Sequence, residues 1–493
     1  MDTRFAISEY NDAVAVNKEL DELIKKPIYT IKPEALKKYE DEYYNKKCLK
    51  SKAQIEEARQ IIPGGVQHNL AFNYPFPLVF TKAEGAYLYD VDGNKYFDFL
   101  QAGGPTVLGS NPKAVREQVI DLLNTCDPST GLFHEFEYKL AKKISDSVET
   151  VDMFRMMGSG TEACMGAARI ARLATKHKNI IKMGGAYHGW SDQMAYGIRV
   201  NGTKFTQAHG VPLNCFMFIQ ETTPNDLDDL ERKLRLNQFR GGTAAVYMEP
   251  VGPESGTTPI TVEYVKGVER LCRKYGALLV FDEVVTGFRI GMAGAQGYFG
   301  VSPDLTIFGK VIAGGYPGAG GIGGKREYMK YLGAGLDSSG KKIHKALVGG
   351  TMTANPLSCC AGYFTLEEIE RTNACQKAGQ MGDRICAGLK ELVKKHGLPF
   401  VVWNTGSICH LETVGTMHYQ INWKKPWEIP AILGETGIRQ KEMEHMGAAY
   451  MAEGLVTLAG SRLYTSAAYT PKMIDQALAC FDRVFENVAV KAD

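Results

Sequence analysis

The chain has 493 residues, 44% of them hydrophobic and 23% charged, so it can bury a large core in two or more domains and is neither disordered nor fibrous. Fifty-seven basic and fifty-five acidic residues leave a formal charge of +2, which gives no electrostatic reason to expect nucleic acid or a membrane surface as partner. We therefore expect a small-molecule ligand.

The N-terminus lacks the basic start and the unbroken apolar run of a secretory signal, and no later segment is apolar for long enough to span a bilayer. The eleven cysteines show no C-x-x-C pair and no metal-site spacing, so we expect reduced thiols and no metal. These features predict a cytoplasmic protein.

Residues 1–55 are rich in lysine and contain no glycine, which predicts a solvated helical extension. An alternative is a lid or basic patch for a phosphate-bearing substrate, using Lys25, Lys26, Lys46 and Lys47. Residues 56–111 follow as a segment that we expect to pack with a smaller C-terminal domain. They contain GAYLYDVDGNKYFDF, in which two alternating runs around Asp-Gly predict a β-hairpin.

From 112 to 365, helical stretches alternate with short apolar runs at 179–183, 244–250, 277–284 and 305–310. This alternation predicts a large α/β domain with a mostly parallel sheet covered on both faces. Residues 366–493 are expected to form the smaller α/β domain. In such sheets, ligands bind beyond the C-terminal ends of the strands.

Each apolar run leads into a residue with useful chemistry. The first leads to Tyr187 and His188, and the next three to Glu249, Asp282 and Lys310. Taken singly these residues are weak signals, because a carboxylate at a strand end is more often a loop cap and a lone lysine is usually solvated.

The stretch MMGSGTEACMGAARIARLAT adds an anion cradle. Its Gly-Ser-Gly turn opens a helix at Thr161, so backbone N–H groups and the positive end of the helix dipole converge there. An ordinary capped helix would start in a similar way. However, the small residues Ser159 and Gly160 also let a phosphate approach the backbone.

Together, a lysine, a strand-end carboxylate, an aromatic-histidine pair and an anion cradle are what a pyridoxal phosphate enzyme requires. The motifs GSGTEA, GAYHG, MEPVG, VFDEVVTGFR, DLTIFGKVIAGG and GGTMTANP occur in that order. From about Ile61 to the C-terminus the chain resembles the class III aminotransferases of fold type I, in particular their glutamate-semialdehyde aminomutase branch. The resemblance implies a large domain with a mostly parallel seven-stranded sheet, a smaller α/β domain and pyridoxal 5'-phosphate as cofactor.

The resemblance also implies residue roles. Lys310 would be the Schiff-base lysine and proton carrier, and Asp282 the partner of the pyridine nitrogen, while Tyr187 and Val284 would cover the two ring faces. In a homodimer, Thr351 would complete the partner's phosphate site. The implied cofactor-binding set is Ser159, Gly160, Thr161, Tyr187, His188, Glu249, Asp282, Val284, Lys310 and Thr351.

Two positions depart from the family pattern. His68 stands where an arginine is expected to hold a substrate carboxylate, and Gly103 stands where a tryptophan is expected. Loss of the guanidinium and of the indole volume favours a substrate that is larger or lacks a free carboxylate at that end. This counts against glutamate-semialdehyde isomerisation.

We therefore expect transfer of an amino group from a β-amino acid-type donor or its CoA thioester, for example 3-aminobutyryl-CoA, to 2-oxoglutarate or pyruvate. Arg462 is the expected cation for the oxo acid, ahead of Arg289. An uncharged amine donor explains the same losses, and an aminomutase or an amino acid racemase or epimerase would use the same residues.

The run GAGGIG at 318–323 fits a dinucleotide-binding pattern and raises the alternative of a nucleotide-binding oxidoreductase. That pattern requires a strand directly before it and an acidic residue about 20 positions later at the end of the next strand, whereas here AGGYP precedes the run and the polar, helix-like segment GKREYMKYLGAG follows it. We interpret these glycines instead as a tight turn beside the cofactor.

Overall fold

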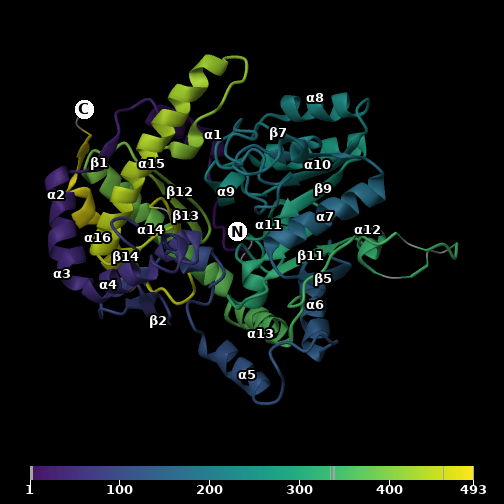
Figure 1. The fold of residues 1–493 in the computed structure, drawn as a ribbon, viewed down its shortest axis with the longest axis horizontal. Coiled ribbons are helices and arrows are strands. Elements are labelled where there is room, and N and C mark those ends of the chain that lie inside the picture. Colours follow the sequence, from purple (N-terminus) through teal and green to yellow (C-terminus); the bar gives the residue numbers. More distant parts are fainter. Residues whose placement is uncertain (1–3, 334, 337–338, 343, 459, 492–493) are drawn as a thin grey trace.

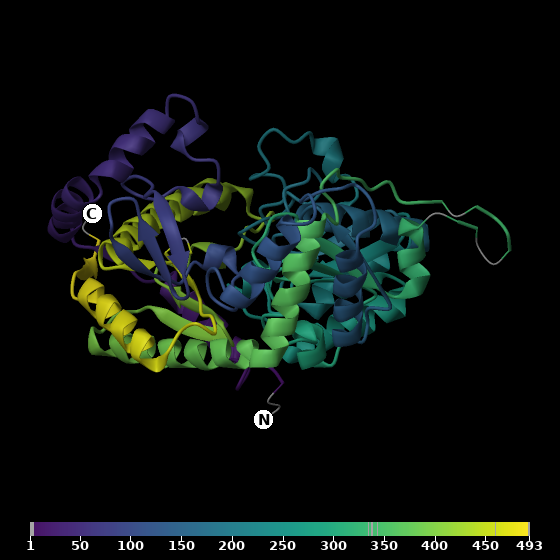
Figure 2. The same ribbon diagram turned by 90° about the horizontal axis from the view of Figure 1, so that it is seen from below.

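The computed structural model describes residues 4–333, 335–336, 339–342, 344–458 and 460–491. It has two lobes, with the large sheet in one and the smaller sheets in the other (Figure 1). Figure 2 shows the two lobes side by side when viewed from below. No described helix has the length and apolar character needed to cross a membrane.

The larger lobe is built on a seven-stranded sheet in the order β5-β11-β10-β9-β8-β6-β7. Its strands are β5 (Met153–Met157), β6 (Asn179–Met183), β7 (Ile219–Thr222), β8 (Thr243–Met248), β9 (Leu278–Asp282), β10 (Leu305–Gly309) and β11 (Gly320–Gly324). Only β11 runs antiparallel to its neighbours. The predicted α/β fold with a mostly parallel seven-stranded sheet is confirmed.

Helices cover both faces of this sheet, because its strands are buried and largely apolar on both sides. One face packs against α7 (Gly160–Thr175). The other packs against α6 (Glu135–Ser147), α8 (Leu227–Asn237), α10 (Val262–Tyr275), α11 (Gly294–Phe299) and α13 (Pro356–Thr372). Three further helices belong to this part of the chain: α5 (Lys113–Leu123), α9 (Pro253–Gly256) and α12 (Arg326–Met329).

The smaller lobe contains three small sheets. Their strands are β1 (Tyr29–Ile31) with β16 (Val488–Val490); β2 (Phe80–Glu84), β3 (Tyr87–Asp90) and β4 (Lys95–Asp98) with β14 (Leu455–Val456); and β12 (Val401–Thr405), β13 (Ile408–Glu412) and β15 (Arg462–Tyr464). Its helices are α1 (Ala13–Leu23), α2 (Pro33–Lys38), α3 (Asn45–Lys47), α4 (Leu49–Ala58), α14 (Ala374–Lys395), α15 (Ile429–Ala452) and α16 (Pro471–Phe485).

The predicted hairpin is present as β3 and β4, which pair antiparallel around the Asp-Gly turn. β4 also pairs in parallel with β14, so the segment before residue 111 is joined to the C-terminal part of the chain. This pairing agrees with the expected packing of residues 56–111 against the smaller domain, and the domain boundaries at residues 55, 111 and 365 remain our proposal.

The glycine-rich run is only partly the turn that we expected. Residues 320–324, GGIGG, form β11 between β5 and β10. A Cβ on Gly320 would lie 2.1 Å from the Ser159 carbonyl oxygen. The glycines therefore allow a strand to pass directly beneath the start of α7, in addition to the turn before it.

The N-terminal extension is attached to the smaller lobe along much of its length. Leu20 and Leu23 of α1 pack on Val401 and Trp403, and β1 pairs with β16. Lys25 and Lys26 follow α1, whereas Lys46 and Lys47 lie in α3 at the outer edge of the lobe (Figure 1). The four lysines therefore do not form one basic surface, as the lid hypothesis required.

Candidate active site

Three residues predicted from the strand ends meet at one edge of the large sheet. Glu249 follows β8, Asp282 is the last residue of β9, and Lys310 directly follows β10. The three strands are parallel neighbours, so their C-terminal ends share an edge. Glu249 and Asp282 are buried and Lys310 is half-buried.

The Asp282 carboxylate is held by three groups. Its Oδ2 lies 2.7 Å from Nδ1 of His188 and accepts from the Cys164 thiol at 3.6 Å. Its Oδ1 accepts the backbone N–H of Val284 at 3.1 Å. Burial lowers the pKa of His188, and the neighbouring Asp282 opposes that shift. The result is a buried and firmly oriented carboxylate, which suits the N–H of a cationic ring.

Cys164, His188 and Asp282 place one ligand atom each within 4.8 Å of the others, which is also compatible with a metal site. Burial raises the pKa of Cys164 well above its usual range, and Asp282 adds to the rise. Metals bind the thiolate, so this thiol acts as a donor to Asp282. Sequence analysis missed Cys164, although it lies one helical turn after Gly160.

The helix start that we expect to bind an anion has the predicted cap, and anion binding there remains a prediction. Ser159 caps α7, and its Oγ accepts the backbone N–H of Glu162 at 3.2 Å. A Cβ on Gly189 would lie 2.4 Å from Oγ1 of Thr161, so the absent side chain lets the Tyr187 loop close on the start of α7. The helix dipole at this end favours a phosphate.

Val284 packs between the cradle and the lysine. A Cβ on Gly160 would lie 3.0 Å from one Val284 methyl group, and a Cβ on Gly309 would lie 2.8 Å from the other. Val284 therefore stands directly beside the residue that precedes Lys310.

Lys310 adopts a left-handed conformation with φ 49°, which costs a residue other than glycine roughly 1–3 kcal/mol. Its Nζ donates a short hydrogen bond to the Gly103 carbonyl oxygen. Burial lowers the pKa of Lys310, with Arg462 and Arg289 acting in the same direction. A lowered pKa favours the neutral amine, which is the nucleophilic form.

The Glu249 carboxylate joins two loops. Oε1 accepts the backbone N–H groups of Tyr187 and Glu254, each at 3.0 Å, and Oε2 accepts that of Ser255 at 2.7 Å. Burial raises the pKa of Glu249 to about 8, and the Asp282 and Glu254 carboxylates add to the rise. Glu249 thus positions the loop of Tyr187 and the turn of Glu254 relative to each other.

That turn presents Glu254 to the predicted acceptor cation. Glu254, Ser255 and Gly256 all have positive φ, at 51°, 61° and 91°. Arg462 donates to the Glu254 carbonyl oxygen at 2.8 Å and to its Oε2 at 3.1 Å. The Arg462 side chain is 12% exposed and its charge is compensated by Glu254. Sequence analysis missed Glu254, whose only signal is its place in the MEPVG motif region.

Arg289, the second candidate for the acceptor cation, is fully buried. Its guanidinium donates to the carbonyl oxygens of Gly104 and Thr465 and to Oγ of Ser407. Burial lowers the pKa of Arg289 to about 10. These bonds tie three distant segments together and leave Arg289 committed to the backbone.

Lys182 is a further residue that sequence analysis missed. It is fully buried in β6, and its ammonium donates to the carbonyl oxygens of Ala186, Met194 and Tyr196 at 2.8, 3.1 and 2.8 Å. Burial lowers the pKa of Lys182 to about 8. Lys182 thereby holds both ends of the loop that carries Tyr187 and His188.

His68 and Gly103, the two departures from the family pattern, differ in their exposure and contacts. His68 is exposed, and its Nδ1 accepts the backbone N–H of Leu70 at 3.1 Å. A Cβ on Gly103 would lie 3.4 Å from a methyl group of Leu70 and 3.8 Å from Nζ of Lys310. The space expected to be emptied at Gly103 is therefore partly filled by Leu70.

Thr351 is exposed, and Tyr187 and Trp190 are 47% and 78% exposed. The contribution of Thr351 to a partner's phosphate site remains a prediction.

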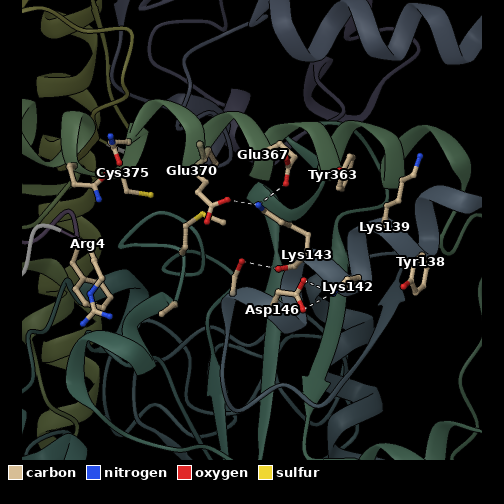
Figure 3. Close-up of a pocket in the computed structure, with 17 residues that line it drawn as sticks. Arg4, Tyr138, Lys139, Lys142, Lys143, Asp146, Tyr363, Glu367, Glu370 and Cys375 are labelled. Carbon is tan, nitrogen blue, oxygen red and sulfur yellow. Dashed lines mark hydrogen bonds and ion pairs between the residues drawn. The ribbon is translucent and has the colours of Figure 1, made fainter.

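A cavity of about 690 Å³ lies elsewhere, between the N-terminal segment, α6 and α13 (Figure 3). Lys143 forms ion pairs there with Glu367 and Glu370, and Lys142 with Asp146. None of the predicted cofactor or substrate residues lines this cavity. It is therefore not the catalytic site.

The residues at the sheet edge fit pyridoxal phosphate, because they include an amine with a lowered pKa, an oriented buried carboxylate, a helix N-terminus and an aromatic side chain. The family model for class-III aminotransferases matches residues 70–459. The chain belongs to this family. Pyridoxal 5'-phosphate is accordingly the cofactor of this class III aminotransferase, which is a pyridoxal phosphate-dependent transaminase.

Solved structures agree with this assignment. An omega-transaminase from Sphaerobacter thermophilus is 25% identical, with a TM-score of 0.78 over 90% of this chain and 99% of that one. A beta-phenylalanine aminotransferase from Variovorax paradoxus is 24% identical, with a TM-score of 0.75 over 91% and 96%. A glutamate-1-semialdehyde-aminomutase from Pseudomonas aeruginosa PAO1 is 20% identical, with a TM-score of 0.75 over 95% and 98%.

Proposed function

We propose that this class III aminotransferase transfers an amino group from a β-amino donor with a masked carboxylate, such as 3-aminobutyryl-CoA, to an oxo acid such as 2-oxoglutarate or pyruvate. The observation that carries this proposal is that, among the described residues, none of the three predicted to face a substrate carboxylate offers an unpaired cation. His68 uses its Nδ1 as an acceptor, Arg462 is paired with Glu254, and Arg289 is committed to backbone carbonyls.

A thioester donor fits this arrangement because it brings no free carboxylate that would need a guanidinium partner. A buried carboxylate without such a partner would be strongly disfavoured. The name of the beta-phenylalanine aminotransferase, which shares the fold, adds support for a β-amino donor.

The oxo acid does bring a carboxylate, and Arg462 is the residue that we propose binds it. To do so the acceptor displaces the Glu254 side chain, which is held by one 3.1 Å contact to Nη2 and is attached to a turn with positive φ. The Arg462–Glu254 ion pair therefore suits both half-reactions. It stays intact when the donor brings no carboxylate to Arg462, and it breaks when the carboxylate of the oxo acid binds there.

When bound, pyridoxal phosphate would supply a ring that takes up the electron pair left at the substrate carbon that bears the amino group, which is Cβ in a β-amino donor. The proposed roles of the chain's own residues follow from their positions. Lys310 would take the proton from the carbon that bears the amino group and deliver it to C4′ of the cofactor, and its Nζ is oriented by the Gly103 carbonyl oxygen. Asp282 supports the ring nitrogen, Val284 and Tyr187 cover the ring, and Ser159 to Thr161 hold the phosphate. The working unit is proposed to be a homodimer in which Thr351 completes the partner's phosphate site.

The test is a donor screen with 2-oxoglutarate and pyruvate that includes β-amino acids, uncharged amines and β-aminoacyl-CoA thioesters. We expect the thioesters to give the highest kcat/KM and a new amino acid as product. Product formed without any oxo acid would instead indicate an aminomutase or racemase, and preference for a free β-amino acid would contradict the masked-carboxylate proposal. Lys310→Ala is the control, with turnover reduced about a hundred-fold or more.

A further inference from the structure

Two chain segments beside the active site carry positive charge and aromatic rings but no acidic residue. They are residues 193–220, between β6 and β7, and residues 413–427, between β13 and α15, and neither contains an aspartate or a glutamate. Their cationic or titratable side chains are Arg199, Lys204, His209, His418, Lys424 and Lys425. Their larger aromatic side chains include Phe205, Trp423 and Trp427.

The two segments are bonded to each other across the two lobes. The backbone N–H of Ile421 donates to the Asn201 carbonyl oxygen at 2.9 Å, and Nε1 of Trp423 donates to the Gly202 carbonyl oxygen at 2.7 Å. A Cβ on Gly202 would lie 2.3 Å from the Ile421 carbonyl oxygen, so only glycine permits this approach. The segments therefore form one preformed surface.

This surface is continuous with the loop that covers the cofactor position. The N–H of Arg199 donates to the Gly185 carbonyl oxygen at 3.0 Å, and the N–H of Gly185 donates to that of Gly197 at 2.9 Å. Gly185 lies two residues before Tyr187, whose side chain is 47% exposed. A long substrate that extends outward past Tyr187 would therefore meet the surface next.

The side chains are arranged for a phosphate-bearing aromatic ligand. Nζ of Lys204 lies 4.4 Å from the ring centroid of Trp423. Trp427 is 71% exposed, and Lys424 and Lys425 beside it are exposed. Lys425 forms an ion pair with Glu428 at 3.1 Å, which is solvent-exposed and so holds the ammonium weakly. Ammonium groups suit phosphates, and exposed indoles stack on bases.

We propose that this surface, which we call the Lys204–Trp427 surface, binds the adenosine and phosphate end of the CoA thioester while the acyl group reaches Lys310. The proposal rests on the proposed function, whose substrate class it deepens. It also replaces Lys25, Lys26, Lys46 and Lys47 as the expected place of phosphate contacts. Charge complementarity argues for this occupant, because the nucleotide end of CoA is strongly anionic and carries an adenine.

The test compares the holoenzyme with the variant Lys204→Ala/Lys424→Ala/Lys425→Ala. The matched control is Lys37→Ala/Lys46→Ala/Lys47→Ala, which removes the same charge from exposed positions elsewhere. Each is assayed with 3-aminobutyryl-CoA and with 3-aminobutyryl-pantetheine, which lacks the nucleotide. We expect KM for the CoA thioester to rise about ten-fold in the test variant, with kcat unchanged. KM for the pantetheine thioester should not change, and the control should behave as the parent enzyme.

Free CoA is also titrated by tryptophan fluorescence, since Trp423 and Trp427 are two of the four tryptophans. We expect quenching in the parent enzyme and weaker quenching in the triple variant and in Trp427→Ala. If the triple variant has an unchanged KM for the CoA thioester and turns it over well, the Lys204–Trp427 surface does not bind CoA. The proposed function is unaffected by that result. If no thioester is turned over, the proposed function fails, and the CoA titration alone decides whether the surface binds CoA. Dissociation of the triple variant into monomers identifies a subunit interface and overturns the proposal.

Discussion

Nη2 of Arg462 lies 3.1 Å from Oε2 of Glu254, and Nη1 of the same arginine donates to the Glu254 carbonyl oxygen at 2.8 Å. The two residues are 208 positions apart in the chain, one in β15 of the smaller lobe and one in the turn after β8. The cation that we expect to bind the oxo acid is therefore already paired in the structure. Its availability depends on the position of one carboxylate.

Replacing Arg462 should separate the two half-reactions. We expect Arg462→Ala to lower kcat/KM for 2-oxoglutarate by about ten- to a hundred-fold, because a charged hydrogen bond contributes about 1.5–3 kcal/mol. The reaction with the amine donor alone should change much less. Single-turnover absorbance of the cofactor measures each half-reaction, and Arg462→Lys should restore part of the acceptor rate. Equal losses in both half-reactions would contradict the assignment.

Glu249 offers a test of positioning. In Glu249→Gln, the amide oxygen can still accept from Tyr187 and Glu254, but the amide N–H₂ faces the N–H of Ser255. An unsatisfied buried group costs about 1–3 kcal/mol, so the turn that presents Glu254 should shift. We expect KM for the oxo acid to change by about ten-fold, with a smaller effect on the donor. Unaltered acceptor kinetics in a folded variant would show that Glu249 does not position this turn.

Lys182 should control cofactor retention without touching the cofactor. Lys182→Met leaves three buried carbonyl oxygens without their donor, each at a cost of about 1 kcal/mol or more. The loop of Tyr187 and His188 should loosen, so we expect weaker binding of pyridoxal phosphate and a lower Tm. Lys178→Met is the matched control, because Lys178 is exposed just before the same strand. Cofactor affinity is measured by titration of the apoenzyme. Identical affinities in both variants would show that Lys182 does not control cofactor retention.

The buried His410 should make the free energy of unfolding depend on pH in the acid range. It is buried, its ring stacks on Trp403 at 4.6 Å, and burial lowers the pKa of His410 to about 3 from 6.5, with Arg462 acting in the same direction. Between these values the unfolded chain binds more protons, so stability falls as pH falls from about 6.5 towards 3. The expected slope is on the order of 1 kcal/mol per pH unit. Denaturant unfolding from pH 7 to pH 5 should show a shallower slope for His410→Gln.

Much of the site could be predicted from the sequence because its parts are local. The strand-end positions of Glu249, Asp282 and Lys310 follow from apolar runs, and the cap at Ser159 follows from turn chemistry. Parallel strands then bring their ends to one edge whatever the details of packing. The family motifs added the cofactor, which those residues alone only suggested.

Other features could not be predicted from the sequence because they depend on contacts between distant segments. GGIGG has no alternation of β-branched residues, so its sequence does not predict a strand. It nevertheless pairs with β10 and β5 as β11, and its glycines are required because their neighbours leave no room for side chains. The buried bonds of Lys182 and Cys164 depend on which groups a helix and a loop bring over the sheet. No sequence pattern marks them.

Fold class, family and the residues proposed to surround the cofactor could all be predicted from local sequence patterns, since hydrophobic periodicity and turn residues act over a few positions. Whether Arg289 and Arg462 are free to bind a carboxylate, in contrast, depends on contacts made in the folded chain. Arg462 is paired with Glu254 and Arg289 is committed to Gly104, Ser407 and Thr465, contacts between segments more than 100 residues apart. Such pairings depend on how the two lobes pack against each other, and the same packing joins residues 193–220 to 413–427 into the surface that we assign to CoA.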